Sequence, residues 1–134
     1  MMLEVLCGTV YLLLVAVFLA SLAQLRQFLG TTATIADQAA LDRFKALARV
    51  QMYLALVVMV LGALGVGVSV VLVQRHGLAG LAVMLLTNAL VFLFGLYHKT
   101  VEARARGLEV RAEHLSAEYG RIGDTWVRKP WPDF

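Results

Sequence analysis

The sequence predicts an all-α membrane protein with three transmembrane helices, of which the second and third form an antiparallel hairpin that extends into the cytoplasm as a coiled-coil-like stalk. Three observations predict this fold. Hydrophobic residues make up 60% of the chain and charged residues only 16%, whereas about a quarter of a soluble domain is charged. Three apolar segments each reach the roughly 20 residues that a helix needs to cross the hydrocarbon layer. An apolar heptad seam then continues through the charged segment after the third of them.

Composition also argues against several functional classes. The net charge of +3 is too small to indicate nucleic acid as a partner. Cys7 is the single cysteine, lies in an apolar run and is interpreted as a packing residue.

His76, His98 and His114 are too far apart to form a metal site. No phosphate-binding loop, nucleophilic triad or carboxylate pair is visible, so we expect no catalytic residue, no cofactor and no small-molecule substrate.

Residues 1–30 are predicted to form the first transmembrane helix, with Gly30 as its stop. Its apolar stretch from Leu3 to Leu25 carries only Glu4 as a charge. The motif Ser21-Leu22-Ala23 resembles a signal-peptide cleavage site. No Lys or Arg precedes the apolar stretch, however, so the segment is interpreted as a retained anchor.

Residues 31–52 are predicted as an amphipathic extension of the second helix, and residues 53–73 as its membrane span. Thr34 and Asp37 resemble a capping box, and no Pro or Gly follows Ile35 until Gly62. The prediction is one rod of about 39 residues, nearly 60 Å long. Small residues that let two helices approach closely recur along one face of the span. They are Ala55, Gly62, Gly65 and Ser69.

Residues 74–77 are predicted as a short outer turn, which makes the second and third helices antiparallel neighbours. The third span covers residues 78–98. Asn88 lies near its centre, and Gly95 follows one heptad later. We expect Asn88 to hydrogen-bond Ser69 or a neighbouring backbone group between helices. A polar pathway or ligand site at Asn88 is the alternative.

Residues 99–122 are predicted to continue the third helix as far as about Tyr119, with Gly120 ending it. Phe44 and Leu47 of the second helix are expected to face its apolar seam in a stalk about 30 Å long. A surface-bound amphipathic helix and pairing with another subunit are alternatives. The predicted seam consists of Val101, Ala105, Leu108, Ala112, Leu115 and Tyr119.

Residues 123–134 are predicted as an extended cytoplasmic tail, because Gly120 and Gly123 end the helix and Pro130 and Pro132 follow. Aromatic and cationic residues alternate in the tail, which favours docking onto a partner protein. Contact with lipid headgroups and disorder are the alternatives. The predicted docking residues are Trp126, Arg128, Lys129, Trp131 and Phe134.

The distribution of positive charge predicts the orientation. Of the 12 Lys and Arg residues, only Arg75 lies between the second and third spans; the others flank the first connection or follow the third span. The positive-inside rule therefore predicts an outer amino terminus and a cytoplasmic carboxyl terminus. A plasma membrane is the default location, and the excess of Arg over Lys favours a bacterial inner membrane.

The predicted function is that of a non-catalytic integral membrane subunit, either an accessory part of a larger complex or a homo-oligomer. Its expected partners are the lipid bilayer and other membrane subunits or copies of itself. The alternative is a small homo-oligomeric pore lined by Ser69, Thr87 and Asn88. A third hypothesis is a pigment- or haem-bearing subunit ligated through His98, although a histidine at the membrane interface is far commoner.

Overall fold

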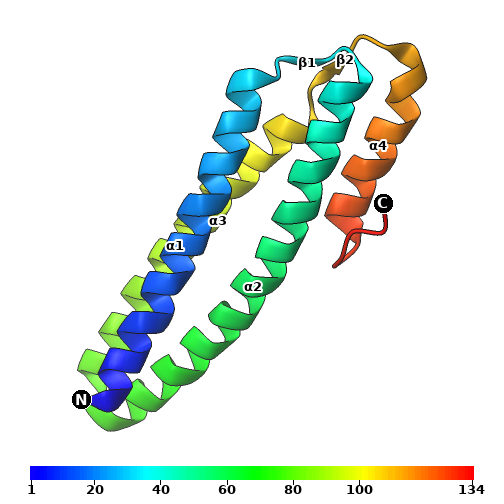
Figure 1. Ribbon diagram of the computed structural model, residues 1–134. Helices are drawn as coiled ribbons and strands as arrows, with labels where there is room; N and C mark the ends of the chain where they lie inside the picture. Colours follow the sequence, from blue (N-terminus) through cyan, green and yellow to red (C-terminus); the bar gives the residue numbers. More distant parts are fainter.

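The computed structural model describes residues 1–134 as four helices and one pair of two-residue strands (Figure 1). The three long helices lie along one another, and the fourth packs beside one half of the second. We call the end that carries the strands the strand end and the opposite end, at Gly77, the turn end. In chain order the elements are α1 (Met2–Thr31), β1 (Thr34–Ile35), α2 (Gln38–His76), α3 (Leu78–Arg106), β2 (Glu109–Val110) and α4 (Glu113–Arg128).

The helices α1, α2 and α3 are each long and apolar enough to cross a membrane, which agrees with the three predicted segments. Most of their apolar surface is not covered within the chain. Only 6% of the most apolar window of α3 is buried, against 28% of the window of α1. Large contiguous apolar surfaces of this kind are rare on soluble monomers. Lipid or other apolar helices are therefore the surroundings that suit this bundle.

The long rod of α2 begins at a capped end. Asp37 is its N-cap, and the Asp37 carboxylate accepts a hydrogen bond from the Ala40 amide at 2.8 Å. The helix then continues without interruption for 39 residues, the length that was predicted. It begins slightly later than expected, because Thr34 and Ile35 belong to β1.

The turn between α2 and α3 is tighter than predicted. Residues 74 to 76 remain helical, and Gly77 alone reverses the chain, with a φ of 57° that favours glycine. Gly80 permits the close approach that follows. A Cβ atom at Gly80 would lie 2.6 Å from the carbonyl oxygen of Leu72. Both glycines are therefore required where the two helices meet.

The third helix is shorter than predicted. It ends at Arg106 rather than near Tyr119, so the continuous rod from Leu78 to Tyr119 is wrong. Gly107 is its C-cap, where leaving the helix is inexpensive because glycine disfavours helix by about 1 kcal/mol relative to alanine. The break lets the following segment fold back along α2 and bury aromatic side chains. Burial of each such side chain stabilises the fold by about 2 kcal/mol or more.

The fourth helix replaces the predicted tail over part of its length. α4 runs through Gly120 and Gly123 to Arg128, so the predicted end of the helix at either glycine is wrong. The buried side chains of Ile122 and Trp126 lie beyond the first glycine and are on the inner face of α4. Tertiary burial therefore outweighs the low helix propensity of glycine here.

A small parallel sheet joins the two connections at the strand end. Thr34 pairs with Glu109 and Ile35 with Val110, and the Arg111 amide donates to the carbonyl oxygen of Ile35 at 3.0 Å. The α1–α2 and α3–α4 connections are thus held side by side. Their pairing closes this end of the molecule over the core.

The hydrophobic core lies at the strand end, with contributions from all four helices. Phe44 of α2 is fully buried at its centre, next to three aromatic side chains of α1 and α4. The core residues are Leu25, Phe28, Ile35, Ala40, Leu41, Phe44, Leu47, Ala48, Met52, Val101, Ala105, Leu115, Tyr119, Ile122 and Trp126.

Candidate functional site

A polar triad joins the three long helices in the middle of their apolar length. Asn88 Nδ2 of α3 donates to Tyr11 Oη of α1 at 2.9 Å, and Tyr11 Oη lies 3.0 Å from Ser69 Oγ of α2. Because the phenol oxygen accepts from Asn88, its own proton is available to Ser69. Asn88 Nδ2 also donates to the Met84 carbonyl at 2.8 Å. Asn88 therefore reaches Ser69 through Tyr11, which the sequence analysis did not single out.

The small residues that were assigned to helix packing fall into two groups. Gly65 and Ser69 are buried, and a Cβ atom at Gly65 would lie 3.4 Å from Tyr11 Cζ, so this face of α2 meets α1. Ala55 is exposed, and a Cβ atom at Gly62 or Gly95 would meet nothing within 4 Å. The second group is thus not used for packing within the chain.

A second polar cluster lies nearer the strand end. Ser21 Oγ of α1 donates to Gln51 Oε1 of α2 and also contacts His98 Nε2 of α3. Gln51 Nε2 donates to the Ser21 carbonyl at 3.1 Å. Since the serine proton goes to Gln51, His98 Nε2 is assigned as the donor to Ser21. The cluster binds the three helices together where their most apolar segments end.

A buried carboxylate extends this cluster. Glu102 is only 3% exposed, and its oxygens lie 3.0 Å from Lys99 Nζ and 3.6 Å from Arg106 Nε. A buried carboxylate needs such partners, because burial of an isolated charge is very costly. The Arg106 guanidinium also lies 6.0 Å from the ring centre of Trp126. Glu102 therefore helps to connect the end of α3 with α4.

These groups border a cavity of about 680 Å³ between the long helices and the end of α4. Its volume is within the range of small-molecule sites. Ser21, Gln51, His98 and Glu102 form a polar wall, and Phe18 and further apolar side chains of α2 and α3 form an apolar part. We call this space the interhelical cavity. It is lined in addition by five residues that the sequence analysis assigned to helix packing or docking, namely Ala55, Gly95, Trp126, Arg128 and Lys129.

The predicted seam residues gather around Phe44, although not along one rod. Val101 and Ala105 are buried on α3, and Leu115 and Tyr119 are buried on α4. Leu108 and Ala112 are partly buried in the connection and pack against the same core as Leu47. The seam therefore folds into the core of this chain, with a reversal of direction after Gly107.

Tyr119 holds this reversal in place. Its hydroxyl donates to the Ala105 carbonyl at 2.9 Å and accepts from the Leu108 amide at 3.0 Å. Burial raises the pKa of the Tyr119 phenol, while the Leu108 amide and the Arg106 charge lower it by smaller amounts. The neutral phenol is thus the form that the fold favours.

The predicted docking residues differ in their surroundings. Trp126 is 7% exposed and stands 5.8 Å from Phe44 between ring centres, so it is a core residue rather than part of an exposed tail. Phe134 folds back onto α2, where Arg49 contacts its main-chain oxygen and lies 6.0 Å from its ring centre. Lys129 pairs with Asp133. Trp131 is 61% exposed.

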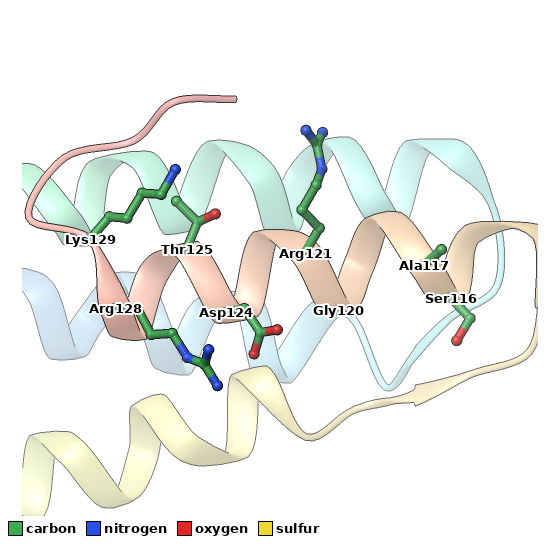
Figure 2. Close-up of a pocket in the computed structure, with 8 residues that line it drawn as sticks. All are labelled: Ser116, Ala117, Gly120, Arg121, Asp124, Thr125, Arg128 and Lys129. Carbon is green, nitrogen blue, oxygen red and sulfur yellow. The ribbon is translucent and has the colours of Figure 1, made fainter.

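The outer face of α4 carries a surface hollow of about 470 Å³ (Figure 2). Its charged side chains do not converge. Figure 2 shows Arg121 and Lys129 on one side of α4 and Asp124 and Arg128 on the other. This surface is polar and open to solvent, and it contains no arrangement of groups that indicates catalysis.

Neither the titratable groups nor the comparisons with known proteins point to a chemical reaction. No group of three or more His, Cys, Asp or Glu side chains is placed to hold a metal ion. Comparison of the chain with protein-family models, with curated proteins and with solved structures finds no match.

Proposed function

We propose that the protein is a non-catalytic integral membrane subunit that acts through helix packing in the membrane and through its α4 region outside it. One observation carries the proposal. The polar groups of the apolar bundle are bonded to one another, as in the Asn88–Tyr11–Ser69 triad, whereas the outward faces of α2 and α3 are apolar. Such a molecule presents apolar surfaces on which other helices can pack, and the polar side chains of its bundle are bonded within the chain.

One unused small residue supports assembly with other helices. Gly62 has no neighbour within 4 Å of a Cβ position, so it leaves a shallow place on the outer surface of α2. In membranes, small residues of this kind permit close contact between helices. The partner on this proposal is another membrane subunit or a second copy of the chain. Trp131 and Arg128, both exposed, are then available for contacts outside the membrane.

The proposed location is the plasma membrane, with a bacterial inner membrane favoured by composition. The concentration of Lys and Arg toward the strand end supports a cytoplasmic strand end and an outer turn end. The amino terminus lies at the end where α2 turns into α3 (Figure 1), which is consistent with an outer amino terminus.

A pore is less well supported than a packing subunit. The side chains of Asn88 and Ser69, which would line it, are bonded to Tyr11 within one chain. Thr87 Oγ1 likewise donates to the Val83 carbonyl at 2.8 Å. A conducting path normally presents its polar groups to water or ions.

The test is the mass of the particle solubilised in mild detergent from its native membrane, compared with the 14.7 kDa of one chain. We expect a homo-oligomer or a complex with co-purifying membrane proteins. Gly62→Leu is expected to reduce that mass, because the added side chain separates the packed helices. The matched control is Gly8→Leu on α1, where a Cβ atom also meets nothing within 4 Å. A monomeric particle from wild-type protein would refute the proposal.

A further inference from the structure

The interhelical cavity changes character along the length of the bundle. Its apolar part is lined from α2 and α3 by side chains such as Val58, Met59 and Phe92, which lie inside the predicted membrane spans. Its polar part is lined by Gln51 and His98, which lie where those spans end. A molecule that fills the whole cavity must therefore be apolar at one end and polar at the other.

The charges around the polar part favour an anion. Lys99, Arg128 and Lys129 line the cavity, and Glu102 is the single acidic residue there. The Lys99 side chain is 71% exposed although it pairs with Glu102. Arg128 is exposed and takes part in none of the ion pairs of the chain. Lys129 pairs with Asp133, so Arg128 is the cation of this lining that has no acidic partner.

The remaining polar wall does not compete for that anion. Ser21 and Gln51 are bonded to each other, and Ser21 also contacts His98, so their hydrogen-bonding groups are occupied within the chain. Ala55 and Gly95 line the apolar part and contribute little or no side chain there. An acyl chain needs a smooth apolar slot, and a phosphate group needs mobile cations near it.

We propose that the interhelical cavity binds one anionic glycerophospholipid, with an acyl chain between α2 and α3 and the phosphate beside Lys99 and Arg128. The position of the cations at the ends of the apolar segments matches the level of lipid headgroups in a bilayer. The proposal requires that the bundle sits in a membrane, but it does not depend on the oligomeric state. A lipid in this cavity would contact α2, α3 and α4 at once.

Native mass spectrometry can count the lipids that stay bound. The full chain in mild detergent is mixed with equal amounts of phosphatidylglycerol and phosphatidylcholine that carry identical acyl chains. We expect one phosphatidylglycerol to be retained in preference. One Lys or Arg near an anionic lipid typically changes affinity about fivefold. Lys99→Gln combined with Arg128→Gln should therefore reduce phosphatidylglycerol retention about 25-fold.

The apolar part of the cavity is tested separately. Gly95→Leu fills the slot without a clash of its Cβ atom, so it should reduce retention of both lipids. Arg75→Gln at the turn end is the matched control and should change neither. Inorganic phosphate at the same concentration as the lipid should not displace the lipid, because it lacks the acyl chain.

Four results would overturn the proposal. They are equal retention of the two lipids by the wild-type chain, an unchanged preference in the double variant, unchanged retention in Gly95→Leu, or displacement by inorganic phosphate. Helical circular dichroism verifies folding of each variant. If the double variant does not fold, the single variant Arg128→Gln is used for the test, because Arg128 is exposed and unpaired. Retention of phosphatidylglycerol should then fall about fivefold.

Discussion

The ring of Phe44 on α2 lies 4.5 Å from the ring of Tyr119 on α4, measured between ring centres. This contact brings together residues from the beginning of the second helix and the middle of the last one. Phe28 and Trp126 lie 6.0 Å and 5.8 Å from the same phenylalanine. Tilted aromatic pairs at these distances add stability beyond their burial. Phe44 is thus the residue through which α1 and α4 are both attached to α2.

Replacement of Phe44 by alanine should loosen α4. We expect Phe44→Ala to lower the free energy of unfolding by about 3–5 kcal/mol, because it leaves a cavity among three aromatic rings. Denaturant unfolding in detergent measures this. In a Trp131→Phe background Trp126 is the remaining tryptophan, and its fluorescence should shift to longer wavelength. Val50→Ala, at an exposed position of α2, is the control, and an equal loss there would contradict the prediction.

Removal of the Tyr119 hydroxyl should destabilise the reversal between α3 and α4. Tyr119→Phe leaves the Ala105 carbonyl and the Leu108 amide without their partner. An unsatisfied buried polar group costs about 1–3 kcal/mol, so a loss of that size is expected in the same unfolding assay. Faster hydrogen exchange at the Leu108 amide would locate the effect. Unchanged exchange at Leu108 would show that the hydroxyl does not hold the reversal.

The same hydroxyl predicts a dependence on alkaline pH. Burial raises the pKa of Tyr119 above its value in the unfolded chain, so its contribution is complete below the unfolded pKa of about 10. The contribution is lost as the pH rises through the higher folded pKa. Stability measured from about pH 9 to about pH 11 should therefore fall more in wild-type protein than in Tyr119→Phe. Parallel curves would contradict this assignment.

The polar triad should contribute modestly to the bundle. Tyr11→Phe removes the links to Asn88 and Ser69, but Asn88 keeps its bond to the Met84 carbonyl. Interhelical hydrogen bonds in membranes contribute about 1 kcal/mol, and we expect a loss of that order in detergent unfolding. Tyr53→Phe is the matched control, since Tyr53 is 54% exposed. The triad has no structural role if the two variants are equally stable.

Gly80 should be the least replaceable glycine of the bundle. Gly80→Ala places a methyl group 2.6 Å from the Leu72 carbonyl oxygen, so the two helices must separate. Overpacking of this kind costs about 1–3 kcal/mol and should lower the thermal midpoint. Gly67→Ala meets nothing within 4 Å and should leave the midpoint unchanged or raise it. A tolerated Gly80→Ala would contradict the close approach of α2 and α3.

The apolar helices could be predicted because hydropathy and helix length are local properties of the sequence. The 39-residue length of α2 followed from the absence of an early Gly or Pro, and the reversal after it followed from a short polar connection. The point at which α3 ends was not predictable in the same way. Gly107, Gly120 and Gly123 are alike as local signals, yet only Gly107 interrupts a helix. What distinguishes them is the burial of Tyr119 and Trp126 against Phe44, which is a property of the folded chain.

The polar clusters were only partly visible in the sequence. Asn88 was recognised because an amide in an apolar span needs a partner. Tyr11 could not be recognised from its residue type alone. Its role depends on the rotation of α1 relative to α2 and α3. The interhelical cavity depends even more on the tertiary structure. Its lining extends from Phe18 to Pro130 and combines residues that had been assigned to separate segments of the sequence.

The fold-back of α4 has a consequence for the order in which the chain folds. α4 leaves the ribosome after α1, α2 and α3, and Phe44 of α2 has no cover from Tyr119 and Trp126 until then. The strand-end core therefore cannot close during synthesis of the first three helices. This core must close afterwards, when α4 packs against the exposed start of α2. Those contacts join residues that are distant in the sequence.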